Sequence, residues 1–81
     1  MPKVKVYVTL KPGILDPQGT TVAKALKSLG FRDVEDVRIG KFIELYMSDV
    51  EEDEIPQQVE EMCRKLLANP VIENYSFEIE K

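Results

Sequence analysis

Few side chains in this sequence could carry out chemistry by themselves. The chain contains no histidine, which removes the residue most often used as a general acid or base and as a zinc ligand. The single cysteine, Cys63, cannot form an internal disulfide or a thiolate metal cage. Because Cys63 lies on an apolar stripe and no histidine can activate it, we expect it to be a buried core residue. We therefore predict no catalytic residue, no metal site and no cofactor in this chain.

Two short segments have the residue types of a binding site. At Asp16-Pro17-Gln18-Gly19, a helix N-terminus could offer free N–H groups to an anion. The lysine and glycine spacing of a phosphate-binding loop is missing, so a capped helix start is the favoured interpretation. Gly19 disfavours a helix, which indicates close approach of a neighbouring segment or subunit. Arg38 and Lys41 flank Gly40 and could hold an anion or a partner carboxylate, although charges beside a turn are usually solvated.

Composition indicates one small domain that covers residues 1–81. Hydrophobic residues make up 43% and charged residues 32%, an ordinary balance for a folded, soluble chain. The net charge of −4 disfavours binding to nucleic acids or anionic membranes, which needs a positive surface. No apolar run approaches the roughly 20 residues of a membrane span, and the N-terminus has no signal-peptide region, so we expect a cytoplasmic protein.

Periodic elements on either side must position the candidate segments. Residues 3–11 alternate between apolar and polar side chains, which predicts a half-buried strand. Asp16 and Pro17 favour the start of a helix over residues 17–29, and Gly30 suits its end. The apolar face of this helix consists of Val22, Ala25, Leu26 and Leu29.

A second helix has the clearest apolar stripe in the chain. It begins near Pro56, which is tolerated only in a first turn, and Asn69-Pro70 ends it. The stripe consists of Ile55, Val59, Met62, Cys63 and Leu66. Residues 71–80 predict a closing strand, with Tyr75, Phe77 and Ile79 on one face.

The middle region, residues 34–47, allows two interpretations. Gly40 could occupy a two-residue hairpin turn that joins two strands. Alternatively, one long strand is bent by a bulge at Gly40. The favoured interpretation has two strands and gives the order β-α-β-β-α-β; the bent strand gives β-α-β-α-β.

These elements predict an α+β fold, a two-layer sandwich with a mainly antiparallel sheet and both helices on one face. The other face of the sheet then meets water or a partner. It would carry Lys3, Lys5, Tyr7, Thr9, Lys11, Glu44 and Tyr46. Because 81 residues bury a limited core, we expect self-association through such surfaces.

Three segments in register resemble a known family. They are residues 11–19 (KPGILDPQG), 37–45 (VRIGKFIEL) and 67–75 (LANPVIENY). Together, in a chain of this length, they resemble PurS, the small subunit of phosphoribosylformylglycinamidine synthase (FGAM synthase). The resemblance runs from Val4 to Ile79.

The resemblance implies an assembly function within a carbon–nitrogen ligase of de novo purine biosynthesis. A glutaminase subunit (PurQ) releases ammonia from glutamine, and a large synthetase subunit (PurL) binds ATP and magnesium. The synthetase uses the ammonia to convert formylglycinamide ribonucleotide (FGAR) to formylglycinamidine ribonucleotide (FGAM). PurS subunits bridge the two, support ammonia transfer and form dimers or higher oligomers. A chain without catalytic residues, cofactor or metal is consistent with such a bridge.

For the interface we choose residues by their chemistry in the loop before the first helix and at the middle turn. They are Asp16, Gln18, Gly19, Arg38, Gly40 and Lys41. Asn69 and Pro70 are expected to be structural. The alternative function is a regulatory module of similar α+β fold that binds a small metabolite. A free-standing enzyme is the least favoured class.

Overall fold

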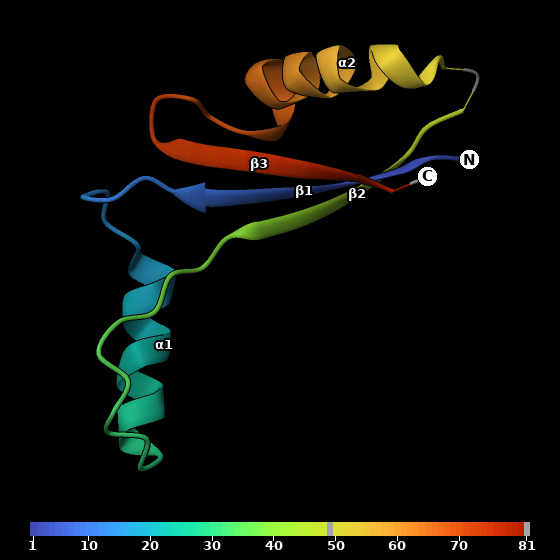
Figure 1. Cartoon of the computed structure of the whole chain (residues 1–81). Helices are drawn as coiled ribbons and strands as arrows, with labels where there is room; N and C mark the ends of the chain where they lie inside the picture. The colour runs from blue at the N-terminus through green and yellow to red at the C-terminus, as the bar shows by residue number, and fades with distance from the viewer. Residues whose placement is uncertain (49, 81) are drawn as a thin grey trace.

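The computed structural model describes residues 1–48 and 50–80, and its centre is an antiparallel sheet. The strands are β1 (Lys3–Leu10), β2 (Lys41–Tyr46) and β3 (Glu73–Glu80), in the spatial order β2-β1-β3. Both neighbours run antiparallel to β1, with Val6 opposite Ile43 on one side and Phe77 on the other. The α+β class with an antiparallel sheet is confirmed (Figure 1).

The described residues contain three strands, so the favoured four-strand order was wrong. The observed order of regular strands and α-helices is β-α-β-α-β. Residues 34–40 pair with no strand, and two of their N–H groups bind side chains instead. The N–H of Val37 donates to the Asp36 carboxylate at 2.9 Å, and that of Ile39 donates to Asp16 at 2.8 Å. Gly40 has no positive φ, so it does not occupy the first central position of the expected two-residue hairpin turn.

One helix covers the sheet. α2 (Ile55–Met62) follows the short 3-10 turn η1 (Glu52–Glu54) and continues into the π-helical turn η2 (Cys63–Leu67). Its inner side chains pack on the valines of β1, which are buried because side chains alternate along a strand. The buried apolar core comprises Val4, Val6, Val8, Met47, Ile55, Val59, Cys63 and Ala68. Cys63 is a core residue, as predicted.

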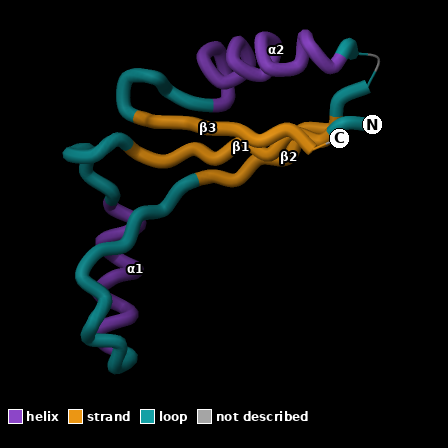
Figure 2. The backbone as a smooth tube through the Cα atoms, in the orientation of Figure 1, coloured by secondary structure: helices purple, strands orange, loops and turns teal. Residues whose placement is uncertain are grey.

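The expectation that both helices lie on one face was wrong. α1 (Pro17–Ser28) extends away from the end of the sheet, and α2 alone forms the second layer (Figures 1 and 2). Residues 29–40 return alongside α1, and we call α1 together with these residues the arm. The predicted apolar face of α1 does not contact the sheet: Leu26 is half-buried, whereas Val22, Ala25 and Leu29 are exposed, Leu29 by 73%.

The second helix departs from its predicted stripe at its last member. Ile55, Val59 and Cys63 are buried, but Leu66 is 82% exposed. A π-helical turn contains more residues than an α-helical turn, so it rotates the side chains that follow Cys63. Leu67 takes the inward position and packs against the core.

The uncovered face of the sheet has the polar and aromatic residues that alternation predicted. Tyr7 stacks on Phe42 with ring centroids 5.3 Å apart. Two ion pairs cross the strands, Lys3 to Glu44 at 2.7 Å and Lys5 to Glu80 at 2.6 Å. The face is therefore internally paired and also exposes aromatic rings.

Candidate interaction site

The predicted interface residues come together at the base of the arm. Asp16, Gln18 and Gly19 begin α1, while Arg38, Gly40 and Lys41 lead into β2. A shallow hollow at this base is lined by Leu10, Asp16, Pro17, Gln18, Ile39, Gly40, Lys41 and Glu73. Two segments about 20 residues apart in the sequence thus form one site. Whether these residues contact another chain stays a prediction.

Asp16 is the hydrogen-bonding centre of this site. One carboxylate oxygen, Oδ1, accepts from the backbone N–H of Gly19 at 2.8 Å, which caps α1. The other, Oδ2, accepts from the N–H of Ile39 at 2.8 Å on the returning segment. Asp16 is only 6% exposed. The bond from Ile39, the bond from Gly19 and the charge of Arg38 lower the pKa of Asp16, against the opposing effect of burial.

Glycines allow the two limbs of the arm and the sheet to approach closely. A Cβ atom on Gly19 would overlap the backbone carbonyl of Val37. A Cβ atom on Gly40 would overlap the backbone carbonyl of Val8 at the end of β1. Gly19 is therefore required inside the first turn for the close approach of a neighbouring segment, as predicted.

The two cations of the site bind backbone carbonyls of their own chain. The Arg38 guanidinium donates to the carbonyls of Ile14 at 3.2 Å, Leu10 at 3.3 Å and Lys11 at 3.1 Å. Lys41 Nζ donates to the carbonyl of Leu67 at 3.2 Å, at the end of η2, where a cation complements the helix terminus. These bonds tie the loop before α1 and the end of η2 to residues 38–41.

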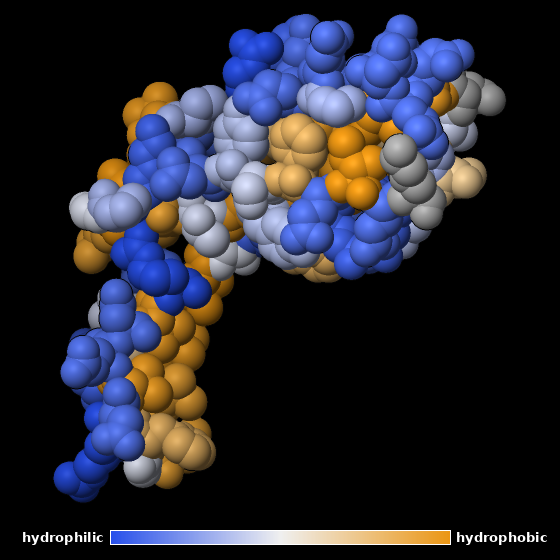
Figure 3. Space-filling model, viewed as in Figure 1, coloured by the Kyte–Doolittle hydropathy of each residue, from blue (hydrophilic) through white to orange (hydrophobic). Residues whose placement is uncertain are grey.

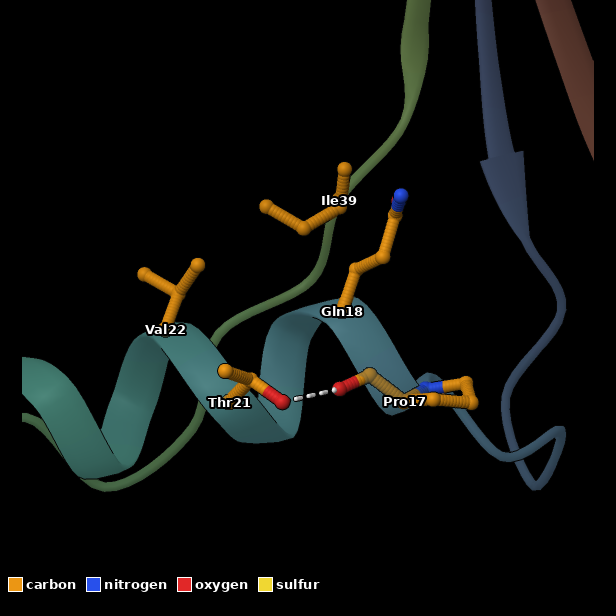
Figure 4. Close-up of a pocket in the computed structure, with 5 residues that line it drawn as sticks. All are labelled: Pro17, Gln18, Thr21, Val22 and Ile39. Carbon is orange, nitrogen blue, oxygen red and sulfur yellow. Dashed lines mark hydrogen bonds between the residues drawn. The ribbon is translucent and has the colours of Figure 1, made fainter.

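A second hollow of about 520 Å³ continues along the arm. Its lining side chains come from α1 and from Ile39 on the returning segment, as Figure 4 shows. Gln18 and Val22 lie on the same side as Ile39, and the Thr21 hydroxyl donates to the carbonyl of Pro17 at 3.0 Å. The hollow is open and mainly apolar, so it presents a surface for another apolar surface rather than an enclosed ligand site.

Sequence reasoning missed two members of the site. Ile39 was treated only as an apolar strand residue, although its N–H is what Asp16 binds. Glu73 enters the lining from β3, and its carboxylate accepts from the N–H of Asn69 at 2.6 Å. Neither had a sequence signal, because both contributions depend on which segments lie side by side in the fold.

The described residues offer little for catalysis. Burial raises the pKa of the Cys63 thiol, which disfavours the nucleophilic thiolate. Residues 1–48 and 50–80 contain no group of three or more Cys, Asp or Glu side chains placed to hold a metal ion. Within the same residues, no helix combines the length and apolar character needed to cross a membrane.

A sheet covered on one face by a single helix, with a protruding arm that exposes apolar side chains, defines a small α+β protein with an apolar surface outside its core. The chain belongs to the PurS family of FGAM synthase, whose family model matches residues 3–81. The resemblance of the three sequence segments is confirmed.

Relatives support this membership along the whole chain. The chain is 53% identical over 81 residues to the phosphoribosylformylglycinamidine synthase subunit PurS of Bacillus subtilis, covering 100% of this chain and 95% of the relative. The crystal structure of PurS from Methanocaldococcus jannaschii, one of the subunits of formylglycinamide ribonucleotide amidotransferase, is 46% identical with a TM-score of 0.87. That match covers 100% of this chain and 98% of the M. jannaschii chain.

A third match is to a chain in the structure of PurLQS from Thermotoga maritima. It is 29% identical with a TM-score of 0.81 and covers 99% of this chain and 100% of that chain. The T. maritima chain is thus similar in fold along its full length and is found in a complex of three kinds of subunit.

Proposed function

We propose that this chain is the non-catalytic assembly subunit of FGAM synthase in purine biosynthesis, joining a glutaminase subunit (PurQ) to a synthetase subunit (PurL). The observation that carries the proposal is the full-length match to a chain of the T. maritima PurLQS complex. In this assignment, ATP and magnesium belong to the synthetase, which converts FGAR to FGAM. The glutaminase supplies the ammonia.

The bridge has a physical purpose. Ammonia is mostly protonated in water at neutral pH, and the ammonium ion is not a nucleophile. Transfer between two active sites therefore benefits from a closed interface that excludes water. A small domain that holds both larger subunits in register would provide that closure.

Reconstitution tests this function. We expect FGAM formation from glutamine to depend strongly on the added chain when the two larger subunits are present. FGAM formation from free ammonia should depend on it weakly, because ammonia then reaches the synthetase from solution. Equal dependence of both reactions would indicate a direct part in the synthetase chemistry. Glutamine-driven turnover that is independent of the chain would contradict the proposal and favour the metabolite-binding alternative, which a saturable thermal shift would detect.

We also infer that the arm associates with a second copy of the chain. Hydrophobic side chains follow one side of the arm, toward the angle between arm and body (Figure 3). Val22, Leu29 and Phe31 are exposed apolar residues of the arm, and Val22 and Leu29 are seven positions apart, which is the spacing of one helical face. We call the exposed apolar side of the arm the arm stripe. A two-fold interface lets each copy cover the stripe of the other. Light scattering should then give about twice the 9.3 kDa mass of one chain, or a higher multiple.

A further inference from the structure

The position of the arm is decided within a small region at its base. Beyond that base, α1 and the returning segment run side by side and stand apart from the sheet (Figure 2). Among the described residues, side chains join the arm to the rest of the chain through bonds from Arg38 to the carbonyls of Leu10, Lys11 and Ile14. The N–H groups of Gly19 and Ile39 in the arm also donate to the Asp16 carboxylate at its base. The direction of the arm therefore depends on few groups.

Asp16 and Arg38 act at this base in complementary ways. Through its two carboxylate oxygens, Asp16 joins the start of α1 to Ile39 on the returning segment, so that both segments of the arm extend from the sheet in the same direction. Arg38 ties the returning segment to the loop that precedes α1. Lys41 and Glu73 line the hollow with Asp16, and the positive charge of Arg38 also acts on the Asp16 carboxylate. Both side chains are occupied inside the chain, so their contribution to assembly is indirect.

We propose that Asp16 and Arg38 are positioning residues that fix the direction of the arm and thereby the alignment of the subunits during ammonia transfer. This inference rests on the proposed assembly function.

A small rotation at the base of the arm produces a large displacement at its far end. α1 has 12 residues and is therefore about 18 Å long. A rotation of roughly 10° at its base moves its far end by about 3 Å, which is large when an error of about 1 Å in placement can slow a reaction about a hundredfold. Weaker bonds at the base of the arm would leave the glutaminase and synthetase active sites intact but out of alignment with each other.

The test uses the complete reconstituted complex with matched variants. Asp16→Asn removes the carboxylate that serves two N–H groups, and Arg38→Lys keeps the charge but loses the guanidinium fork. The controls make the same changes nearby. Asp36→Asn alters an exposed carboxylate that accepts from the N–H of its neighbour Val37, and Arg32→Lys alters an exposed arginine of the same segment.

Arm direction is measured by spin labels on cysteines substituted for Ser28 at the end of α1 and for Glu61 on α2, both exposed. Labelled chains are diluted with unlabelled chains so that only distances within one chain contribute. Amide exchange at the core valines Val4, Val6 and Val8 reports whether a variant is folded. Turnover is followed with glutamine and with free ammonia.

We expect Asp16→Asn and Arg38→Lys to broaden the label-to-label distance distribution and to lower glutamine-driven turnover about tenfold, while ammonia-driven turnover stays unchanged. Asp36→Asn and Arg32→Lys should match the wild type in the distance distribution, in glutamine-driven turnover and in ammonia-driven turnover. Faster amide exchange at the core valines in Asp16→Asn would mean that this variant is partly unfolded. In that case, the comparison of Arg38→Lys with Arg32→Lys tests the inference.

Two results would overturn the inference. One is a distance distribution in Arg38→Lys as narrow as that of Arg32→Lys. The other is a broadened distribution with glutamine-driven turnover unchanged. Failure of the proposed function looks different, because wild-type chain would then be dispensable for glutamine-driven turnover.

Discussion

At the scale of single residues, Asp16 combines two tasks that are usually separate. A helix-capping side chain normally binds only N–H groups of its own first turn. Asp16 caps α1 through Gly19 and also binds Ile39, so the cap holds a distant segment. The absence of a side chain at Gly19 makes this possible, because a Cβ atom there would overlap the Val37 carbonyl. A residue that weakens the helix therefore stabilises the tertiary structure.

Acid should weaken this connection. Hydrogen bonds from Ile39 and Gly19 hold the pKa of Asp16 below the ordinary 3.8. A pKa lowered by folding adds stability above the unfolded-state value, and that stability is lost as the pH falls through the folded-state value. We expect wild-type protein to lose more free energy of unfolding than Asp16→Asn between about pH 5 and about pH 2. Urea titrations at a fixed protein concentration measure this loss.

Other carboxylates do not confound the comparison. The hydrogen bond from Lys5 lowers the pKa of Glu80, but that pair is present in both proteins. Parallel pH profiles for the two proteins would show that the Asp16 carboxylate contributes no stability of its own.

At the scale of elements, the change from α2 to η2 decides which side chains enter the core. The regular helix positions Ile55 and Val59 over β1, and the π-helical turn then replaces Leu66 by Leu67 on the inner side. The Tyr75 hydroxyl donates to Glu60 at 2.6 Å and joins this helix to β3. Helix and sheet are thus held by packing inside and by a hydrogen bond at the margin.

Truncation of single side chains should reveal which residues of α2 and η2 face the core. Ile55→Ala removes fully buried methyl and methylene groups and should lower the free energy of unfolding by about 3 kcal/mol. Leu66→Ala alters an exposed side chain and should change it by less than about 0.5 kcal/mol. Denaturant unfolding at one protein concentration compares them, with the slope of each transition as a check that the unfolded states are alike. A cost at Leu66 equal to that at Ile55 would contradict the π-helical turn.

At the scale of the whole molecule, the chain is elongated. Its Cα radius of gyration is 16.2 Å, whereas a compact domain of 81 residues has about 12 Å. The excess comes from the arm, which exposes apolar side chains that a compact fold would bury. Such a shape gains from association, because a partner supplies the burial that the isolated chain lacks.

Disrupting the arm stripe should separate the copies. Leu29→Gln places an amide where a second copy would pack, and it should reduce the mass in solution to that of one chain at micromolar concentration. The matched control is Leu66→Gln, the same change at a leucine that is also exposed but lies on η2. Light scattering compares the two. A multimeric mass for Leu29→Gln would remove this part of the arm from the interface.

Local periodicity was enough to predict several elements correctly. The alternating valines of β1 face the core, Asp16 caps α1, and Gly30 adopts φ of 105° after the helix. The closing strand was predicted with its inward face correct, although it begins at Glu73 rather than residue 71. These features depend on neighbouring residues along the chain, which is why sequence reasoning could find them.

Patterns along the chain were enough to predict most helices and strands, the buried cysteine and the family to which the chain belongs. They could not predict that residues 34–40 form one limb of an arm, because this depends on Asp16 binding the N–H of Ile39 in place of a strand neighbour. The tertiary structure also decided that Leu66 is exposed and that α1 leaves the sheet. An amphipathic pattern shows that a face needs a partner, but which surface becomes that partner depends on contacts between segments far apart in the chain.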